Sequence, residues 1–357
     1  MKIIQITHKF GPGSVAYLVH SIHNHLNNNG YDSIWIGFSN PNNISLSKNE
    51  ISLNLKSAKN PISIFKLRKV IKKILFEDPE IVIHTHLTWP FFYSILATSG
   101  LNCKIIHTEH NTYNKRRKIK FIKYIERLFY KKCDKIVCIS DGTRNSLARW
   151  IGVNFSSMRL LTIYNGSRIF DSKNQNIEFK NPLNIVTIGS LTTQKGVDTA
   201  IDGINLARGI INKYRIVGKG PLAKPLKDKV NRLNLKDKVE FVGWVDDVET
   251  ELKNADIFLM PSNWEGFGLA AVEAMSVGLP GIVSGVDGLN EVVAGVNKGI
   301  YTVPPGDSKA IANGIQYLYE SREHFPDMAK EVRQQALQFS IPSMVRKYES
   351  VYCNLIK

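Results

Sequence analysis

The chain has 357 residues, of which 43% are hydrophobic and 22% are charged. This composition excludes a disordered or fibrous protein, the absence of an apolar run of about 18 residues excludes a membrane span, and the length predicts two domains. The net charge of +16 lies in the first half, because residues 1–168 carry 25 Lys and Arg against 9 Asp and Glu, whereas residues 169–357 carry 22 of each. We therefore expect the first half to meet an anionic partner: nucleic acid, a phospholipid surface or a phosphorylated substrate.

Strands and helices are expected to alternate from the N-terminus onward. Residues 2–7 predict an apolar strand, and residues 15–30 predict a helix with apolar side chains at helical spacing. A basic amphipathic helix is expected at 62–75, and a basic helical stretch before 134. The other strands of this half are expected at 32–38, 79–86, 103–110, 134–140 and 158–166.

The same alternation restarts after a polar linker at 170–182. Strands are expected at 183–190, 213–220, 239–245, 255–262 and 279–284, and helices at 195–208, 221–234, 269–278, 288–295, 308–321 and 341–356. Two consecutive sets of this kind predict an α/β protein with two Rossmann-like, doubly wound parallel-sheet domains, at 1–168 and 169–340. Because such sheets bind ligands at the carboxyl ends of their strands, we expect the site in a central cleft that the two domains face.

Two loops of the second half are candidates for binding phosphate. "GSLTTQKG" (189–196) follows a strand and offers backbone amides, the hydroxyl of Ser190 and the charge of Lys195. Such turns bind phosphate through unpaired amides and the helix dipole. The alternative is an ordinary strand-to-helix turn with a surface lysine. "VGKGPL" (217–222), which contains Gly218, is a weaker indication of the same kind.

The stretch "WEGFGLAAVEAM" (264–275) carries two glutamates, one before a predicted helix and one inside it. Glu265 precedes a helix expected to begin near Leu269, and Glu273 lies five residues past Gly268, about 7.5 Å along the helix axis. Carboxylates accept hydrogen bonds from neighbouring sugar hydroxyls, and the free amides at the helix start suit an anion. A nucleotide-diphosphate sugar fits this layout. The alternative, a capping carboxylate and a solvated glutamate, is disfavoured by the apolar neighbours of Glu273.

Taken together, these motifs resemble the family-four glycosyltransferases of the GT-B fold. The resemblance rests on "EGFGLAAVEAM" and covers nearly the whole chain, with "GSLTTQKG", "VGKGPL", "VEFVGWV", "GLPGIVS" and "GLNEVV" in the second half. In the first half "GSVAYLV", "THLTW", "TEHNTY", "CISDGTRNSL" and "YNG" fall in the family's order. The resemblance also implies that the terminal helix, 341–357, packs back on the first domain.

The resemblance implies a role for each candidate residue. Glu273 binds the ribose hydroxyls, Glu265 and His110 face the donor sugar, and Lys195 neutralises the departing diphosphate. The catalytic candidates are thus Glu265, Lys195 and His110. The donor-binding candidates are Gly13, Ser14, Ser190, Lys195, Gly218, Val245, Glu265, Gly266, Phe267, Gly268, Leu269 and Glu273. Such enzymes retain the anomeric configuration, and the resemblance implies no cofactor and no metal.

Two departures from the family pattern affect the phosphate site. Many relatives carry an arginine where Ser190 stands, so Lys195 has less help than in those enzymes. The glycine pair of the first loop is reduced here to Gly13 followed by Ser14. Both changes alter the expected geometry of phosphate binding, but neither is expected to remove activity.

A basic segment predicts a further partner. Residues 111–135 carry ten basic and two acidic side chains, interleaved with aromatic and aliphatic ones. Such a segment can lie on an anionic membrane, and the glycosyltransferase resemblance favours that interpretation over a solvated helix face or nucleic acid. The residues expected at the membrane are Lys115, Arg116, Arg117, Lys118, Lys120 and Lys123.

The sequence therefore predicts a retaining glycosyltransferase that moves a hexosyl or N-acetylhexosaminyl group to a glycan or lipid-linked acceptor in cell-surface polysaccharide or lipopolysaccharide synthesis. Its rivals are a GT-B nucleotide-sugar epimerase and a basic nucleic-acid-binding protein. Eight of the nine histidines precede residue 111, but acidic partners there are sparse, so no metal site is expected. The N-terminus has no signal-peptide pattern, which predicts a cytoplasmic enzyme. The four cysteines show no metal spacing and are expected to be free thiols. The basic segment and the family resemblance place the enzyme at the inner face of the cell membrane as a peripheral protein.

Overall fold

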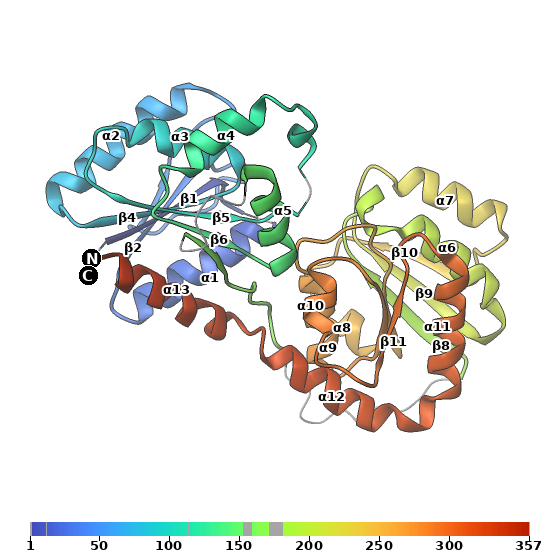
Figure 1. Cartoon of the computed structure of the whole chain (residues 1–357). Coiled ribbons are helices and arrows are strands. Elements are labelled where there is room, and N and C mark those ends of the chain that lie inside the picture. The colour runs from blue at the N-terminus through green and yellow to red at the C-terminus, as the bar shows by residue number, and fades with distance from the viewer. Residues whose placement is uncertain (1, 12, 113, 153–158, 171–180, 357) are drawn as a thin grey trace. The chain divides into compact units, whose positions relative to one another are not determined.

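The chain folds into two compact units, Met1–Gly166 with Ile341–Lys357, and Ser167–Ser340 (Figure 1). The structure, a computed structural model, describes residues 2–11, 13–112, 114–152, 159–170 and 181–356. The expected linker, 170–182, lies largely outside these residues. The boundary between the units falls two residues before the expected one, so Ser167 and Arg168 belong to the second unit. The terminal helix belongs to the first.

The first unit is built on a seven-stranded sheet in the order β3-β2-β1-β4-β5-β6-β7. Every neighbouring pair is parallel, as continuous apolar strands predict. Its strands are β1 (Lys2–Lys9), β2 (Asp32–Ser39), β3 (Glu50–Ser52), β4 (Ile81–His86), β5 (Lys104–Glu109), β6 (Lys135–Cys138) and β7 (Leu160–Thr162). Its helices are α1 (Ser14–Asn28), α2 (Ile62–Glu77), α3 (Thr88–Ala97), α4 (Ile122–Tyr130), α5 (Asp141–Ile151) and α13 (Ile341–Ile356), with a 3-10 turn, η1 (Lys115–Lys118).

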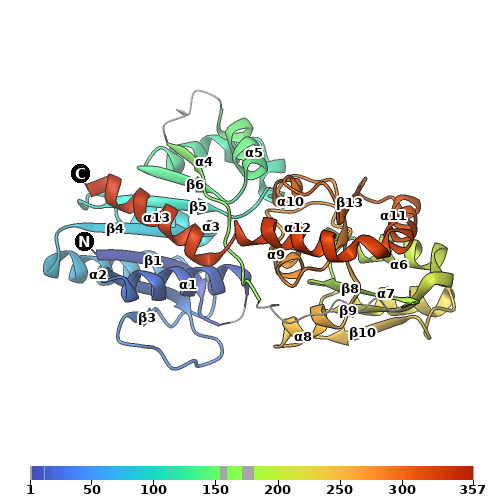
Figure 2. The same ribbon diagram turned by 90° about the horizontal axis from the view of Figure 1, so that it is seen from below.

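Strand alternation gives the two faces of the first sheet different characters. Ile4 and Ile6 of β1 pack with Ile83 of β4 against helices α2 and α3. On the opposite face, α13 lies beside α1 (Figure 2). There the side chain of Gln5 in β1 is hydrogen-bonded to Tyr352 of α13. One face is therefore apolar, and the other is partly polar and covered by the terminal helix.

The second unit holds a six-stranded parallel sheet in the order β10-β9-β8-β11-β12-β13. Its strands are β8 (Leu183–Ile188), β9 (Ile211–Val217), β10 (Val239–Gly243), β11 (Ile257–Met260), β12 (Gly281–Ser284) and β13 (Ile300–Val303). Its helices are α6 (Val197–Leu206), α7 (Ala223–Arg232), α8 (Val248–Lys253), α9 (Leu269–Ser276), α10 (Leu289–Val293), α11 (Ser308–Glu320) and α12 (Phe325–Leu337). Three 3-10 turns complete it: η2 (Thr193–Lys195), η3 (Arg208–Ile210) and η4 (Arg322–His324).

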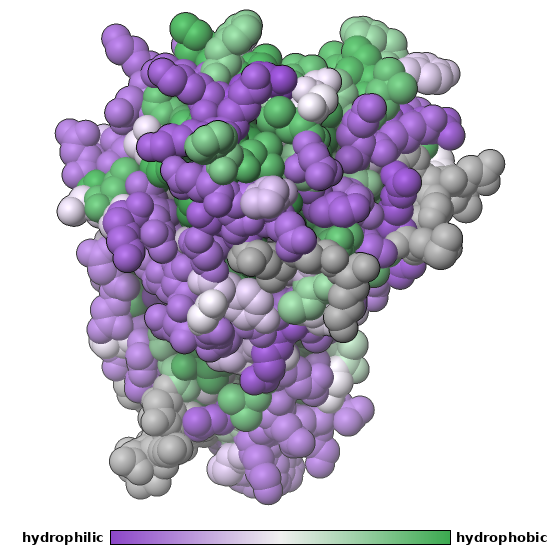
Figure 3. Space-filling model, turned by 90° about the vertical axis from the view of Figure 1, so that its left-hand side faces the viewer, coloured by the Kyte–Doolittle hydropathy of each residue, from purple (hydrophilic) through white to green (hydrophobic). Residues whose placement is uncertain are grey.

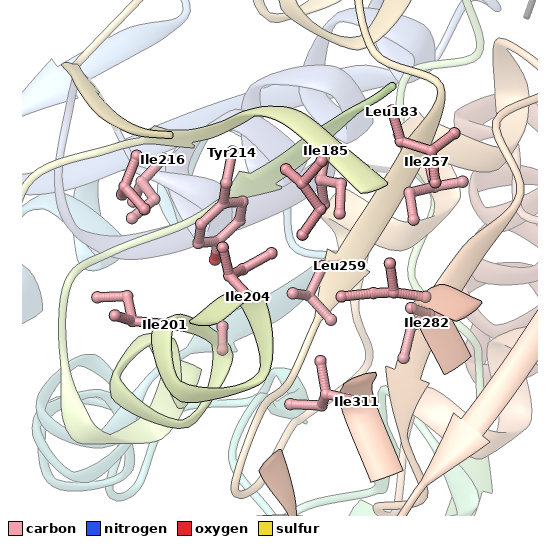
Figure 4. Close-up of a cluster of buried hydrophobic side chains, with 14 of the residues drawn as sticks. Leu183, Ile185, Ile201, Ile204, Tyr214, Ile216, Ile257, Leu259, Ile282 and Ile311 are labelled. Carbon is pink, nitrogen blue, oxygen red and sulfur yellow. The ribbon is translucent and has the colours of Figure 1, made fainter. Parts of the chain in front are cut away.

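The core of the second unit fixes the position of its strand ends. Ile185 and Leu259, from the two central strands, pack with Ile204 of α6 and Ile311 of α11 (Figure 4). All four side chains are at most 1% exposed. Helix α9 packs against α10 and α12. This close packing makes the sheet a rigid base for the loops that follow its strands.

Two other expectations concern membrane spans and cysteines. In the described part of the chain, no helix combines the length and apolarity needed to cross a bilayer. All four cysteines are free thiols, as expected: Cys103, Cys133, Cys138 and Cys353.

Candidate active site

The loops that follow the strands of the second sheet are hydrogen-bonded to one another. Because the strands are parallel, their carboxyl ends meet at one edge of the sheet. The amide of Leu191 donates to the carbonyl of Lys219 over 3.0 Å, and the amide of Asn263 donates to the carbonyl of Gln194 over 2.8 Å. The loops after β8, β9 and β11 therefore form one continuous surface.

Gly218 allows the first two of these loops to approach so closely. Its φ of +142° is a conformation that side-chain-bearing residues rarely adopt, and a Cβ here would lie 1.9 Å from the carbonyl oxygen of Gly189. The amide of Gly218 donates to the carbonyl of Gly243 at the end of β10 over 2.7 Å. The sequence placed Gly218 among ligand-binding residues; in the structure its glycine character also brings three strand ends together.

Lys195 and Glu265 form an ion pair across this surface. The Lys195 ammonium, from η2, bonds the Oε1 atom of Glu265, and the Ser262 hydroxyl donates to the same oxygen over 2.9 Å. The side chains are 18% and 7% exposed, respectively, so both are drawn in from solvent. Two residues that the sequence named as catalytic candidates are thus in direct contact, 70 positions apart in the chain.

Glu273 is paired with a different cation. Its Oε1 atom accepts a hydrogen bond from Nε of Arg168 over 2.8 Å, and its side chain is 12% exposed. Burial raises the pKa of Glu273 above its usual range, and the Arg168 guanidinium partly offsets that rise. The expectation that Glu273 is not a solvated helix residue is confirmed.

The segment between the two glutamates starts helix α9. Gly268 precedes the helix with φ of +110°, a left-handed conformation that glycine adopts without strain, and α9 runs from Leu269. Phe267 is 2% exposed, with its ring centroid 5.3 Å from that of Phe339. The buried ring of Phe267 and the start of α9 therefore fix the backbone from Gly266 to Leu269. The first amides of a helix lack intrahelical acceptors, so those of α9 can donate to a ligand.

The other donor-binding candidates of the second unit lie on its loops. Ser190 is exposed, with its hydroxyl oxygen 3.5 Å from that of Thr192. Val245 is half-buried and follows the end of β10. Both lie on loops that follow strands, Ser190 after β8 and Val245 after β10, because these strands end two residues before the expected positions.

The remaining candidates belong to the first unit. Gly13 and Ser14 are exposed at the start of α1. His110 follows β5 and is half-buried, with its Nε2 atom 3.2 Å from Nδ1 of His86. Burial lowers the pKa of His110 to about 4, so the ring is neutral at pH 7. His110 can therefore act there as a hydrogen-bonding group but not as a cation.

Sequence reasoning missed three residues of this surface. Arg168 was assigned to the first domain, yet it lies in the second unit and pairs with Glu273. Ser262 contacts Glu265, and the Asn263 side chain donates to the carbonyl of Thr193 over 2.6 Å. The only signal in the sequence was their position, either two residues after the boundary motif "YNG" or two to three residues before Glu265.

The basic segment differs from its expected arrangement at two residues. Arg117 contacts Glu109 over 3.1 Å, and Arg116 pairs with Glu126; the arginine side chains are 10% and 20% exposed. Both arginines are thus engaged by buried carboxylates, so the expectation that they face a membrane is wrong. Lys118 and Lys120 are exposed and Lys123 is half-exposed. The side chain of Lys115 lies outside the described part of the chain.

The histidines form no recognisable metal site. Among the described residues, no group of three or more His, Cys, Asp or Glu side chains could hold a metal ion. His84, His86 and His110 instead belong to a hydrogen-bonded chain of uncharged groups.

Both units match family models of glycosyltransferases. Residues 15–167 match the family model for "Glycosyltransferase Family 4", and residues 169–336 match the model for "Glycosyl transferases group 1". The chain is 27% identical over 329 residues to the Escherichia coli UDP-Gal:alpha-D-GlcNAc-diphosphoundecaprenol alpha-1,3-galactosyltransferase, covering 85% of this chain and 82% of that protein.

Two solved structures share the fold over nearly their whole length. A glycosyltransferase from Rickettsia africae superposes with a TM-score of 0.85 at 21% identity, covering 100% of this chain and 98% of the other. Anabaena HepE, solved in complex with UDP and glucose, superposes with a TM-score of 0.81 at 18% identity, covering 98% and 99%. These similarities establish the fold that the resemblance implied.

We predict that replacing Arg168 with Met makes stability depend more strongly on pH. Without the guanidinium, the pKa of Glu273 rises further above its unfolded value. An acid with a raised folded-state pKa loses stability as the pH rises through that pKa. Urea unfolding should therefore show a loss of about 1–3 kcal/mol at pH 8 that shrinks toward pH 5. The double variant Arg168→Met, Glu273→Gln should lose this pH dependence; a pH-independent loss shared by both variants would contradict the assignment.

Proposed function

The chain belongs to the family-four glycosyltransferases of the GT-B fold and uses a nucleotide sugar, and we propose that its donor is a UDP-hexose and its acceptor a lipid-linked glycan. The observation that carries the proposal is the loop and helix bearing Glu265 and Glu273, two low-exposure carboxylates that are each matched by a cation. Such carboxylates accept hydrogen bonds from vicinal hydroxyls at two separate places, as a nucleotide sugar requires.

The choice of donor and acceptor is supported by the relatives. The Escherichia coli relative is named for a UDP-linked galactose and for an acceptor carried on a polyprenyl diphosphate, and Anabaena HepE was solved with UDP. We place this chain in the same class of reaction, the extension of a lipid-linked precursor of a cell-surface polysaccharide or lipopolysaccharide. The two rival functions considered above, an epimerase and a nucleic-acid-binding protein, are not favoured, because both matching family models describe glycosyltransferases.

The proposed chemistry centres on the departing diphosphate. As the bond between the anomeric carbon and the diphosphate oxygen breaks, negative charge grows on the diphosphate and favours a nearby cation. Lys195 supplies that cation, Glu265 holds hydroxyls of the donor sugar, and Glu273 holds the ribose hydroxyls. The amides from Gly266 to Leu269 and the neutral ring of His110 provide further hydrogen bonds to the sugar. No protein nucleophile is required if the acceptor hydroxyl attacks from the face that the diphosphate leaves and its proton passes to the departing diphosphate oxygen.

We predict a division of labour between the two glutamates. Thermal-shift titrations with UDP, GDP, ADP and their sugars should give the largest stabilisation with UDP compounds, since a ligand that binds the native state raises the melting temperature. Glu273→Ala should weaken UDP binding about tenfold or more, whereas Glu265→Ala should leave UDP affinity within about threefold and lower kcat. If no nucleotide shifts the melting temperature, the proposed donor site is wrong; equal loss of UDP affinity in both variants would refute the division.

Lys195 has a matched control in the same unit. Lys229 forms an ion pair with Asp202 over 2.6 Å, and its side chain is 20% exposed against 18% for Lys195. We predict that Lys195→Met lowers kcat by about 10²–10³-fold, as expected for removal of one group that stabilises transition-state charge, while Lys229→Met leaves kcat nearly unchanged. A similar loss in both variants would indicate a general effect on stability.

The stereochemistry and metal requirement are separable from donor binding. We predict that NMR of the first-formed product shows the anomeric configuration of the donor. We also predict that the rate in excess EDTA matches the rate without it, because Lys195 supplies the positive charge. An inverted product would exclude attack from the leaving-group face, and loss of activity in EDTA that added Mg²⁺ restores would exclude the metal-independent mechanism.

We further propose that the first unit docks on an anionic membrane through helix α4. Phe121, Tyr124, Ile125 and Leu128 are between 46% and 70% exposed. Their spacing of three and four residues places them on one face of α4, so this helix presents an apolar stripe to solvent. Figure 3 shows apolar side chains grouped along the upper edge of the molecule, where Figure 1 draws α2, α3 and α4.

The neighbouring charges favour a lipid surface as the occupant. Lys118 and Lys120 are exposed at the start of the stripe, and Lys131 and Lys132 are exposed at its end. Helix α2 adds two more exposed rings, Phe65 and Phe76. Apolar side chains flanked by lysines are typical of segments that insert into the boundary between headgroups and acyl chains of anionic lipids.

We predict that sedimentation with vesicles containing anionic lipid detects this surface. Each lysine near such a membrane contributes about 1 kcal/mol, so changing Lys118, Lys120 and Lys123 to Gln should weaken binding at least about tenfold. The charge-matched control changes Lys224, Lys236 and Lys309, all exposed on the second unit, and should bind as the unsubstituted protein does. Equal weakening in both variants, or no binding to anionic vesicles, would overturn this proposal.

A further inference from the structure

A row of polar side chains crosses the face of the first sheet that α13 covers. Gln5 of β1 lies opposite His84 of β4 in the strand register, and His86 of β4 lies opposite Thr108 of β5. All four side chains are at most 1% exposed. Buried polar groups are costly unless they are hydrogen-bonded, so each member of this row needs a partner.

Two tyrosines of the terminal helix complete the row. The Gln5 amide donates to the Tyr352 hydroxyl over 3.0 Å, and that hydroxyl lies 2.7 Å from Nδ1 of His84. Nε2 of His84 lies 2.7 Å from the Thr108 hydroxyl, which is 3.1 Å from the Tyr348 hydroxyl. One end of the row thus terminates on α13.

The other end of the row reaches His110. The carboxamide oxygen of Gln5 lies 2.9 Å from Nε2 of His86, and Nδ1 of His86 lies 3.2 Å from Nε2 of His110. Burial lowers the pKa of both His84 and His86 well below the usual range of histidine. The rings are therefore neutral at pH 7, and each has one nitrogen that donates and one that accepts.

This neutrality lets the proton positions be assigned one after another. The Gln5 carboxamide oxygen can only accept, so His86 carries its proton on Nε2 and accepts at Nδ1. His110 must then carry its proton on Nε2, which leaves its Nδ1 atom as the acceptor. Toward α13, the Gln5 amide donates to Tyr352, so the Tyr352 proton points to His84. With the Gln5 carboxamide in this orientation, the hydrogen bonds of the whole row run in one direction.

We propose that Gln5 and Tyr352 are positioning residues that fix His110 in the tautomer protonated at Nε2, with Nδ1 presented as a hydrogen-bond acceptor. The assignment of that acceptor to a hydroxyl of the donor sugar rests on the proposed function. The tautomer itself does not, because it follows from contacts within the first unit.

Tyr352 matters because the row has a second consistent direction. If the Gln5 carboxamide were turned over, its amide would donate to His86, His86 would donate to His110, and the His110 proton would move to Nδ1. The structure has the Gln5 amide on Tyr352, which selects the first direction. Reversal would require Tyr352 to donate to the Gln5 oxygen and His84 to carry its proton on Nδ1, so Tyr352 couples the orientation of the carboxamide to the tautomer of His84. Tyr352 therefore acts on His110 through Gln5 and His86, without touching it.

The test reads the tautomer directly, by ring nitrogen chemical shifts in protein labelled with ¹⁵N-histidine and free of donor. His110 is assigned by the loss of its signals in His110→Asn. In the unsubstituted protein at pH 7, we expect a single neutral tautomer with the proton on Nε2. Tyr352→Phe and Gln5→Met should each give a mixture of both tautomers of His110, because each removes one of the bonds that orient the row.

Tyr93 offers a matched control. It is a buried tyrosine of the same unit whose hydroxyl donates to the carbonyl of Lys59 over 2.6 Å, outside the row. Tyr93→Phe loses a comparable hydrogen bond and should keep the His110 tautomer. Where Gln5→Met does not fold, Tyr352→Phe alone decides. A His110 ring that is charged or protonated at Nδ1 in the unsubstituted protein, or one unchanged by Tyr352→Phe, would overturn the proposal.

Activity distinguishes this inference from the proposed function. With a UDP-sugar donor, Tyr352→Phe should lower kcat about tenfold, the equivalent of one weakened hydrogen bond, with donor KM changed less than about twofold. A protein that shows the expected tautomer shift but binds no nucleotide sugar would retain the role of Gln5 and Tyr352 and refute the donor site. A protein that is active with the donor, but whose His110 tautomer is unaltered in both variants, would support the donor site and refute the role of Gln5 and Tyr352.

Discussion

The candidate site of the second unit depends on one ion pair, between Lys195 and Glu265. It joins the loop after β8 to the loop after β11, and the Ser262 hydroxyl bonds the same carboxylate. An ion pair with little exposure pays a desolvation cost that only good geometry and further hydrogen bonds can offset. Here the rigid sheet and the loop-to-loop bonds supply that geometry. The cation is therefore held in place before any ligand binds, which reduces the reorganisation that binding and catalysis require.

The two carboxylates of the loop and helix are balanced by cations from different parts of the chain. Lys195 comes from the loop after β8, and Arg168 comes from the start of the second unit, next to the boundary. Burial of Glu273 makes its charged form less favourable, and Arg168 counteracts this. Without these partners, two carboxylates close in sequence would repel an incoming diphosphate. With them, the surface offers hydrogen-bond acceptors for hydroxyls without a net negative charge.

Apolar patterning predicted most strands and many helices, but it missed helices α5 and α12 and strands β3 and β13, and it could not predict contacts between distant residues. The parallel strands and the burial of Glu273 followed from apolar patterning. Helix α3 was missed because six of its ten residues are buried, so it lacks a clear polar face. The partners of Arg116, Arg117 and Arg168 could not be read from local sequence, because Glu126, Glu109 and Glu273 are 8 to 105 positions away. A run of positive charge does not reveal which of its members point inward.

The terminal helix illustrates how such distant contacts constrain sequence. Tyr348 and Tyr352 are four residues apart and so lie on one face of α13, which meets Thr108, His84 and Gln5. Apolar residues at these two positions would remove the hydrogen bonds from Tyr352 to the Gln5 amide and to Nδ1 of His84, at about 1–3 kcal/mol for each buried polar atom left unpaired. Helix α13 therefore cannot be replaced by any amphipathic helix of the same length, because the buried polar side chains require its two tyrosine hydroxyls. The hydroxyls of Tyr348 and Tyr352 are hydrogen-bonded to side chains that lie more than 200 positions earlier in the sequence. These bonds extend the polar row from α13 to His110.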